Sequence, residues 1–242
     1  MSIINRIPRA YSSASGDPYS VLLLHCDGSD GSTTFLDEST GGSTHTMTAN
    51  VNAQVDTSFK QFGTGSLIGD RTQDTKLSTP YSADFYPGAG DYTIDCWVRI
   101  TGMDTAGFGI CGNLAGSPSN SSGFCLSILG GSTFTAFAFI GSGAGGGAVA
   151  QSTETISYDT LTHIALVITS GYAKVAVGGV FSGTSLPATF VNNALDFVVG
   201  DVYGANSNYN WEFNGHIDEL RVSKGIARWT TNFTPPTSPY TE

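Results

Sequence analysis

The sequence predicts an all-β protein, a two-sheet antiparallel jelly-roll sandwich with an extended N-terminal arm. Short apolar strand patterns recur along the 242 residues, and no long helical pattern separates them. Glycine is abundant, at 31 residues, whereas the helix formers Glu (5) and Lys (4) are scarce. Charged residues are 12% of the chain and hydrophobic residues 40%, a balance that favours a packed core over disorder.

The strand patterns follow one another at short intervals. Runs of apolar residues bounded by Gly, Asp or Asn predict strands at 21–28, 65–70, 91–100, 108–113, 123–129, 134–141, 162–170, 195–201 and 213–223. In the third run, alternation places Ile94, Cys96, Val98 and Ile100 on one face. In the seventh run, Ile164, Leu166 and Ile168 share one face, and Ala165 and Val167 lie on the other.

The connections are predicted from their glycines. Residues 173–183 predict a hairpin that turns at Gly178-Gly179. Residues 141–150 are rich in glycine and predict a loop at the rim of the sandwich, because no phosphate-binding motif accompanies them. Residues 224–230 have the one short helical pattern. Strands without helices between them indicate an antiparallel sandwich rather than βαβ units.

The chain divides into an extended arm, residues 1–19, and one domain, residues 20–242. The arm contains Pro8 and Pro18, which favour extended backbone, and only one acidic residue. We expect it to anchor the domain to partner proteins or to neighbouring copies of the chain. The predicted partner-binding residues are Ile3, Ile4, Arg6, Ile7, Arg9 and Tyr11. The alternative is a frayed terminus without a role.

The net charge of −10 excludes some classes of partner. An acidic chain repels phosphate backbones and anionic membrane surfaces, so neither nucleic acid nor membrane is expected. No apolar run of membrane-spanning length and no secretory signal is present in the sequence. We therefore expect the chain to fold in a reducing cytosol, with the four cysteines reduced.

Five segments carry a resemblance to a known family: VLLLHCDG (21–28), FGTGSLIGD (62–70), DYTIDCWVRI (91–100), LTHIALVITSGYAKVAVGGV (161–180) and FNGHIDELRVSKGIARWTTNFTPP (213–236). Together they resemble the laminin-G-like, concanavalin A-like jelly-roll modules. The last segment is the most specific, and in this form it is similar to bacteriophage virion proteins. The sequence departs from the family at Cys26, where an aromatic residue is common, and at the Gly178-Gly179 turn, where Asp-Gly is common.

The resemblance implies a structural protein of a bacteriophage virion, either a capsid decoration protein or a tail-associated module, that binds other virion proteins. Such a module is expected to form homo-oligomers. The alternative is a lectin-like adhesin that binds host surface glycans. A glycan depolymerase ranks last, because glycoside hydrolysis needs two carboxylates that flank the bond, and the five Glu are not paired along any predicted strand. The sequence therefore predicts no catalytic residues.

A structural calcium ion is the predicted cofactor. Asp218 lies at the position that resembles the family's calcium ligand, and Asp27 ends the first predicted strand. The first and last strands of such sandwiches are commonly paired, which brings these carboxylates together, and calcium prefers oxygen ligands. In the alternative interpretation, Asp218 pairs with Arg221 or Arg99, and Asp27 stabilises a turn.

A polar and aromatic loop, YGANSNYNW (203–211), is the predicted glycan-binding rim. Aromatic side chains stack on sugar faces, and amides nearby bind sugar hydroxyls. The predicted binding residues are Tyr203, Asn206, Asn208, Tyr209 and Trp211. In the alternative, Trp211 caps the core and the asparagines satisfy turns.

Overall fold

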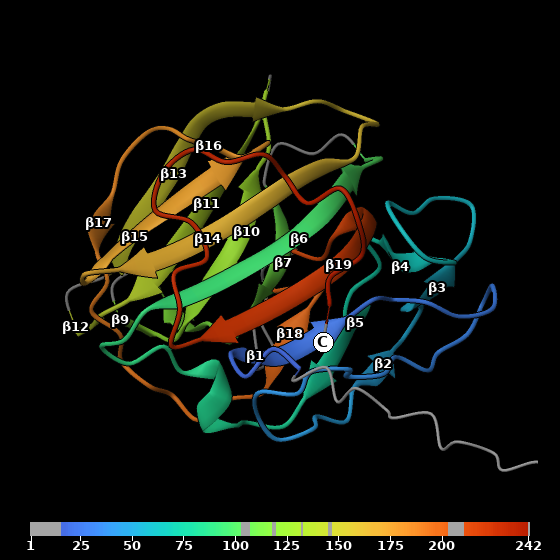
Figure 1. The fold of residues 1–242 in the computed structure, drawn as a ribbon, viewed down its shortest axis with the longest axis horizontal. Coiled ribbons are helices and arrows are strands. Elements are labelled where there is room, and N and C mark those ends of the chain that lie inside the picture. Colours follow the sequence, from blue (N-terminus) through green and yellow to red (C-terminus); the bar gives the residue numbers. More distant parts are fainter. Residues whose placement is uncertain are drawn as a thin grey trace, which may run out of the picture.

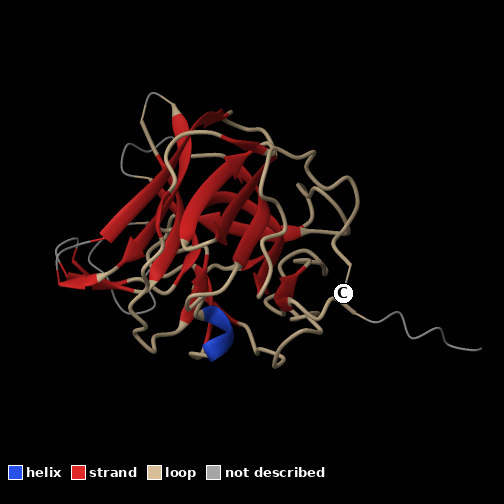
Figure 2. Cartoon of the chain, turned by 60° about the vertical axis from the view of Figure 1, so that its left-hand side comes forward, coloured by secondary structure: helices blue, strands red, loops and turns tan. Residues whose placement is uncertain are grey.

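The computed structural model describes residues 16–102, 107–117, 120–131, 133–144, 147–202 and 211–241. Strands dominate it, and in the described ranges the helical structure is one 3-10 turn, η1 (Ala83–Phe85) (Figure 2). No described helix has the length and hydropathy needed to span a membrane.

The larger of the two main sheets has nine strands. They are β1 (Ser20–Leu24), β3 (Gln54–Asp56), β4 (Ser66–Asp70), β6 (Tyr92–Ile100), β14 (Thr162–Thr169), β15 (Tyr172–Val177), β16 (Val180–Phe181), β17 (Leu186–Pro187) and β19 (Asn214–Lys224). Their order is β16-β15-β14-β6-β19-β4-β3, with β1 paired to β19 and β17 paired to β15 (Figure 1). All the pairings are antiparallel.

The second sheet has seven strands. They are β2 (Thr48–Asn50), β5 (Lys76–Thr79), β7 (Phe108–Gly112), β10 (Phe124–Leu129), β11 (Phe134–Gly141), β13 (Gly147–Ile156) and β18 (Phe197–Val199). Their order is β13-β11-β10-β7-β18-β5-β2. A small third sheet contains β8 (Ala115–Ser117), β9 (Asn120–Ser122) and β12 (Gly143–Ala144).

The core lies between the two main sheets and confirms the predicted sandwich. The inward residues of β6 and β14, such as Ile94, Cys96 and Leu166, belong to one buried apolar cluster. Ala165 and Val167 belong to a separate cluster on the outer face of the nine-stranded sheet, as alternation predicts. The four cysteines are free and buried.

The segment that follows β19 covers part of this outer face. In Figure 1 its red trace crosses over β14 and returns towards β19. Trp229 and Phe233 stack on each other with ring centroids 4.0 Å apart, and each contacts the ring of buried His163 edge-on. This C-terminal segment, residues 225–240, therefore closes a second apolar layer over the sheet.

Beneath the C-terminal segment, the nine-stranded sheet holds a buried ionic network. The Arg221 guanidinium donates to both carboxylate oxygens of Asp95, at 3.1 and 3.0 Å, and lies 4.0 Å from the Tyr240 ring centroid. His163 Nε2 lies 3.5 Å from Asp95 and 3.1 Å from the Tyr240 hydroxyl. Although burial alone would raise the pKa of Asp95, the Arg221 charge and the His163 contact lower it to about 2.

Two predicted connections are wrong. Residues 224–230 are not helical: Gly225 has a φ of 88°, and the chain then runs without regular structure so that Trp229 can pack on the sheet. The second half of the predicted glycine loop is strand β13, whose Gly147 pairs with Gly141. A Cβ at Gly147 would lie 2.2 Å from the Phe139 ring, so glycine here permits close strand pairing. The Gly178-Gly179 hairpin is confirmed, with φ of 58° and 82°.

The predicted arm falls mostly outside the described residues, and so do all six of its partner-binding residues, Ile3, Ile4, Arg6, Ile7, Arg9 and Tyr11. Its last residues contact the domain. Asp17 forms an ion pair with Arg228, and its carbonyl accepts a hydrogen bond from Thr40 Oγ1 at 3.3 Å. The chain is thus held to the sandwich from Asp17 onward.

Candidate functional site

The outer face of the seven-stranded sheet carries a small apolar cluster that is separate from the core. Leu114, Cys125 and Val202 are its buried members, and Phe139 and Trp211 pack against it while half-buried. Phe137 lies two residues before Phe139 on β11, and its ring contacts the Trp211 ring edge-on, with 5.7 Å between the ring centroids. The face therefore presents grouped aromatic side chains, of which Trp211 remains partly accessible.

Two glycines, Gly109 in β7 and Gly107 just before it, make room for Trp211. The amide of Gly109 donates to the Trp211 carbonyl at 2.5 Å. A Cβ at Gly109 would lie 2.7 Å from Val202, and one at Gly107 would lie 3.0 Å from the Trp211 ring. The absence of side chains at these two positions lets the backbone around Trp211 lie directly against β7.

A charged cluster fixes the backbone near Val202 and Trp211. Lys76 Nζ lies 2.9 Å from buried Asp201 and 3.2 Å from Asp74. The Asp201 carboxylate also accepts from the Val202 amide at 2.7 Å, and the Glu212 carboxylate accepts from the Asp74 amide at 3.1 Å. Burial alone would lower the pKa of Lys76, but Asp201 and Asp74 raise it, so the ammonium stays charged.

Of the predicted glycan-binding residues, Tyr203, Asn206, Asn208 and Tyr209 lie outside the described residues. Trp211 is described, and it packs against the outer-face cluster rather than against the main core. Trp211 thus covers a small buried cluster, and its role in glycan binding stays a prediction. Sequence reasoning missed the charged frame around Lys76 and Asp201, whose one signal is the Asp that ends the strand pattern of 195–201.

The predicted calcium ligands Asp27 and Asp218 both contact the loop between β3 and β4, but as acceptors of hydrogen bonds. Asp218 Oδ2 accepts from the amides of Gln61 and Phe62, at 2.6 and 3.2 Å. Asp27 Oδ1 accepts from the amide and hydroxyl of Thr64. The two carboxylates thus hold the same loop, Asp218 at residues 61–62 and Asp27 at Thr64.

This arrangement does not fit a cation as it stands, because hydrogen-bond donors occupy both oxygens of Asp218 and Oδ1 of Asp27. No group of three or more potential metal-ligating His, Cys, Asp or Glu side chains occurs among the described residues. Calcium at Asp27 and Asp218 stays a prediction, for which a calcium-dependent rise in melting temperature that Asp218→Ala abolishes is the test.

Asp218 does not pair with either predicted arginine. Arg221 pairs with Asp95, and Arg99 pairs with Asp159. Asp218 is fully buried, and burial raises its pKa to about 7 although three amides donate hydrogen bonds to it. The ion pairs of the sheet were missed because a charge within an apolar strand does not reveal its partner.

The architecture, two antiparallel sheets packed face to face, defines a jelly-roll sandwich. A model of the Concanavalin A-like lectin/glucanases superfamily matches residues 70–228, more than half of the chain. The protein therefore belongs to this superfamily.

Solved structures of several binding domains share the fold. Domain 4 of AbnA, a GH43 extracellular arabinanase from Geobacillus stearothermophilus in complex with arabinotriose, is 20% identical with a TM-score of 0.59, over 86% of this chain and 95% of that one. A structure of botulinum neurotoxin type C, described by its interaction with two ganglioside molecules, is 13% identical with a TM-score of 0.61, over 86% and 49%.

The botulinum neurotoxin serotype D binding domain is 14% identical with a TM-score of 0.59, over 88% of this chain and 50% of that one. The chain thus spans about half the length of the toxin structures. At these identities the likeness establishes the fold. No curated protein sequence is significantly similar to the chain.

Proposed function

We propose that the protein is a lectin-like carbohydrate-binding module that uses the outer face of the seven-stranded sheet around Trp211. The observation that carries this proposal is the half-buried Trp211, held by Phe137 and by the backbone of Gly109 beside a fixed charged frame. An aromatic ring that is fixed in place offers a flat apolar surface at a low cost in conformational entropy. Sugar rings present a matching apolar face and a polar rim.

The relatives support this proposal. The arabinanase domain is described in complex with arabinotriose, and the type C neurotoxin is described by its interaction with gangliosides. The proposal extends glycan binding to Tyr203, Asn206, Asn208 and Tyr209, which connect Val202 to Trp211 along the chain. We further propose that the module is not an enzyme, in line with the unpaired glutamates of the sequence.

Affinity electrophoresis against a panel of neutral polysaccharides, followed by calorimetry with the oligosaccharide of the best one, tests the proposal. Trp211→Ala is expected to weaken binding by at least about tenfold, because truncation of a central tryptophan typically removes 2 kcal/mol or more. Tyr19→Ala is the matched control, since Tyr19 is an exposed aromatic residue that precedes β1 and lies outside the Trp211 cluster. Equal binding by wild type and Trp211→Ala would contradict the proposal.

A role in a bacteriophage virion is a second proposal, supported by the resemblance of residues 213–236 to virion proteins. In this case the module binds other capsid or tail proteins, with Ile3, Ile4, Arg6, Ile7, Arg9 and Tyr11 as the anchoring residues, and forms homo-oligomers. The two proposals are compatible, because a virion module can also bind host glycans. Imaging of native particles with a labelled module tests the virion role.

A further inference from the structure

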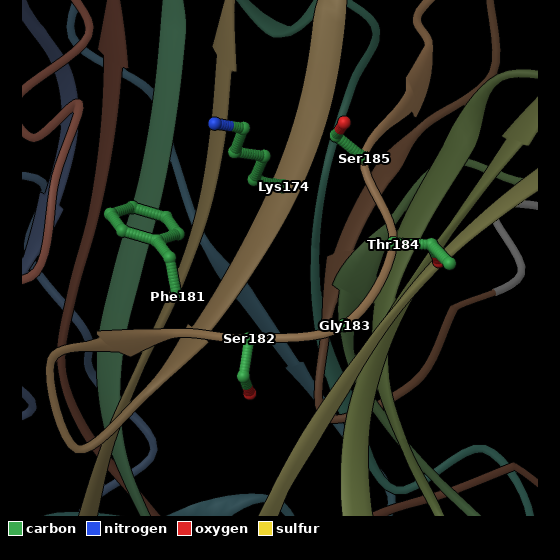
Figure 3. Close-up of a pocket in the computed structure, with 6 residues that line it drawn as sticks. All are labelled: Lys174, Phe181, Ser182, Gly183, Thr184 and Ser185. Atoms are coloured by element: carbon green, nitrogen blue, oxygen red, sulfur yellow. The ribbon is translucent and has the colours of Figure 1, made fainter.

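A polar groove lies on the nine-stranded sheet, away from the Trp211 face. Two adjoining cavities of about 180 and 410 Å³ form it, and Lys174 and Ser185 line both. In Figure 3, the side chains of Lys174, Phe181 and Ser185 lie on the same side of the segment 181–185, and Ser182 points away from them. The larger cavity is within the range of sites for small molecules.

The groove exists because the C-terminal segment covers only part of the sheet. Ala173 and Val175 of β15 point into the core, so Lys174 between them and Tyr172 beside them point outward. Trp229 and Phe233 pack over the outward residues of β14 and over Ala176 of β15. They leave Tyr172 and Lys174 of β15 accessible. Lys174 and Tyr172 thus line the floor of the groove.

The walls of the groove are fixed. The Ser182 hydroxyl accepts hydrogen bonds from the amides of Thr153 and Glu154, at 3.2 and 3.0 Å, which ties the segment 181–185 to β13. Across the groove, Thr230 of the C-terminal segment lines the larger cavity. The site is therefore built from ordered backbone rather than formed by a free loop.

The Lys174 side chain has no polar partner among the described residues. Of the lysine and arginine side chains in the described ranges, it alone forms neither an ion pair nor a hydrogen bond. The side chain is nevertheless half-buried, in a protein with a net charge of −10 that offers many carboxylates. A partly desolvated ammonium without a counter-charge attracts an anion from outside the protein.

The other groups around Lys174 indicate which anion fits. The hydroxyls of Thr169, Ser170 and Ser185 also line the cavities and make no hydrogen bond within the described chain. Tyr172, which is 50% exposed, adds an aromatic ring. One cation, several unpaired hydroxyls and a ring match a sugar that carries one carboxylate.

We propose that this groove binds an acidic saccharide, with its carboxylate on Lys174, its hydroxyls on Thr169, Ser170 and Ser185, and one sugar face on Tyr172. This site does not depend on the neutral-glycan site proposed around Trp211. The charge of Lys174 sets the class of ligand: a hexuronate is expected to bind much more tightly than its neutral ester.

Calorimetry with trigalacturonate and with its methyl ester tests the proposal, at physiological ionic strength where remote acidic residues are screened beyond about 8 Å. The acid is expected to bind and the ester to bind at least about tenfold more weakly, since a hydrogen bond to a charged group typically exceeds 1.4 kcal/mol. Lys174→Gln is expected to reduce binding of the acid to the level of the ester.

Lys60→Gln is the matched control, because Lys60 is exposed and donates only to the Thr57 carbonyl. Trp211→Ala is a second control and should leave trigalacturonate binding unchanged, which separates this site from the proposed function. Equal affinity for acid and ester, full binding by Lys174→Gln, or inorganic phosphate as strong as trigalacturonate would each overturn the proposal. Unchanged melting of Lys174→Gln establishes that the variant is folded.

Discussion

Asp218 illustrates how one buried carboxylate can organise a loop at a cost in stability. It accepts hydrogen bonds from Gln61, Phe62 and Glu219, and burial raises its pKa to about 7 from the ordinary value of 3.8. A group whose pKa is higher in the folded state stabilises the fold while it is protonated. That contribution is complete below about pH 4 and is lost as the pH rises through 7.

We therefore predict that the free energy of unfolding of the wild type falls between pH 4 and pH 8 relative to Asp218→Asn, which cannot ionise. A shift of about three pH units corresponds to a fall of up to about 4 kcal/mol. Urea unfolding at a series of pH values measures it, and the shifted histidines cancel in the comparison because both proteins contain them. If the free energies of unfolding of wild type and Asp218→Asn changed in parallel with pH, the raised pKa of Asp218 would be contradicted.

The sequence identified Asp27 and Asp218 as candidate functional residues, but it did not predict that they accept hydrogen bonds from a loop. A carboxylate that binds calcium and one that accepts backbone N–H donors have the same sequence signature at a strand end. The difference lies in residues 61–65, which reach Asp218 across 157 positions in the sequence. The same holds for Asp95, whose partner Arg221 is 126 positions away.

At the level of elements, the alternation of side chains along a strand predicted the long strands β6 and β14 well. In β14, for example, successive residues belong in turn to the core cluster and to the outer-face cluster. The strands that were missed include the short strands β2, β3 and β5 and the whole of β13. The backbone pairing of these strands needs no particular side chains, so no hydrophobic pattern in the sequence predicts it. The predicted helix at 224–230 failed because tertiary packing of Trp229 outweighs a weak local preference.

The C-terminal segment is an element without regular structure that nevertheless stabilises the fold. We predict that Trp229→Ala lowers the free energy of unfolding by about 2 to 3 kcal/mol, which is less than for a fully buried Trp because the ring is half-buried. For a chain of this length the melting temperature should fall by about 5 to 10 °C.

Differential scanning calorimetry provides the measurement for this variant. Thr230→Ala, at the exposed neighbouring position, is the control and should melt as the wild type does. A Trp229→Ala protein with wild-type melting would show that the stacked pair with Phe233 contributes nothing to stability.

For the whole molecule, the fold class could be predicted from the sequence. The boundary between the arm and the domain could be located only with the structure. Deletion of residues 2–15 is predicted to leave the melting temperature unchanged, because it retains Asp17 and its ion pair with Arg228. Under the virion proposal, the same deletion releases the module from particles. Thermal melting and the occupancy of purified particles measure the two effects separately, and full occupancy by the truncated module would rule out the arm as anchor.

The position of β19 has a consequence for how the chain folds. This strand lies between β6 and β4 and also pairs with β1, through contacts such as Leu24↔Leu220. Until residues 214–224 are in place, β6 and β4 have unpaired edges, and the first strand has no neighbour. Loop closure over such a span is slow, and open edges invite pairing between chains. During synthesis the larger sheet therefore cannot be completed before β19 has been made. We expect the protein to be most prone to aggregation before this strand pairs.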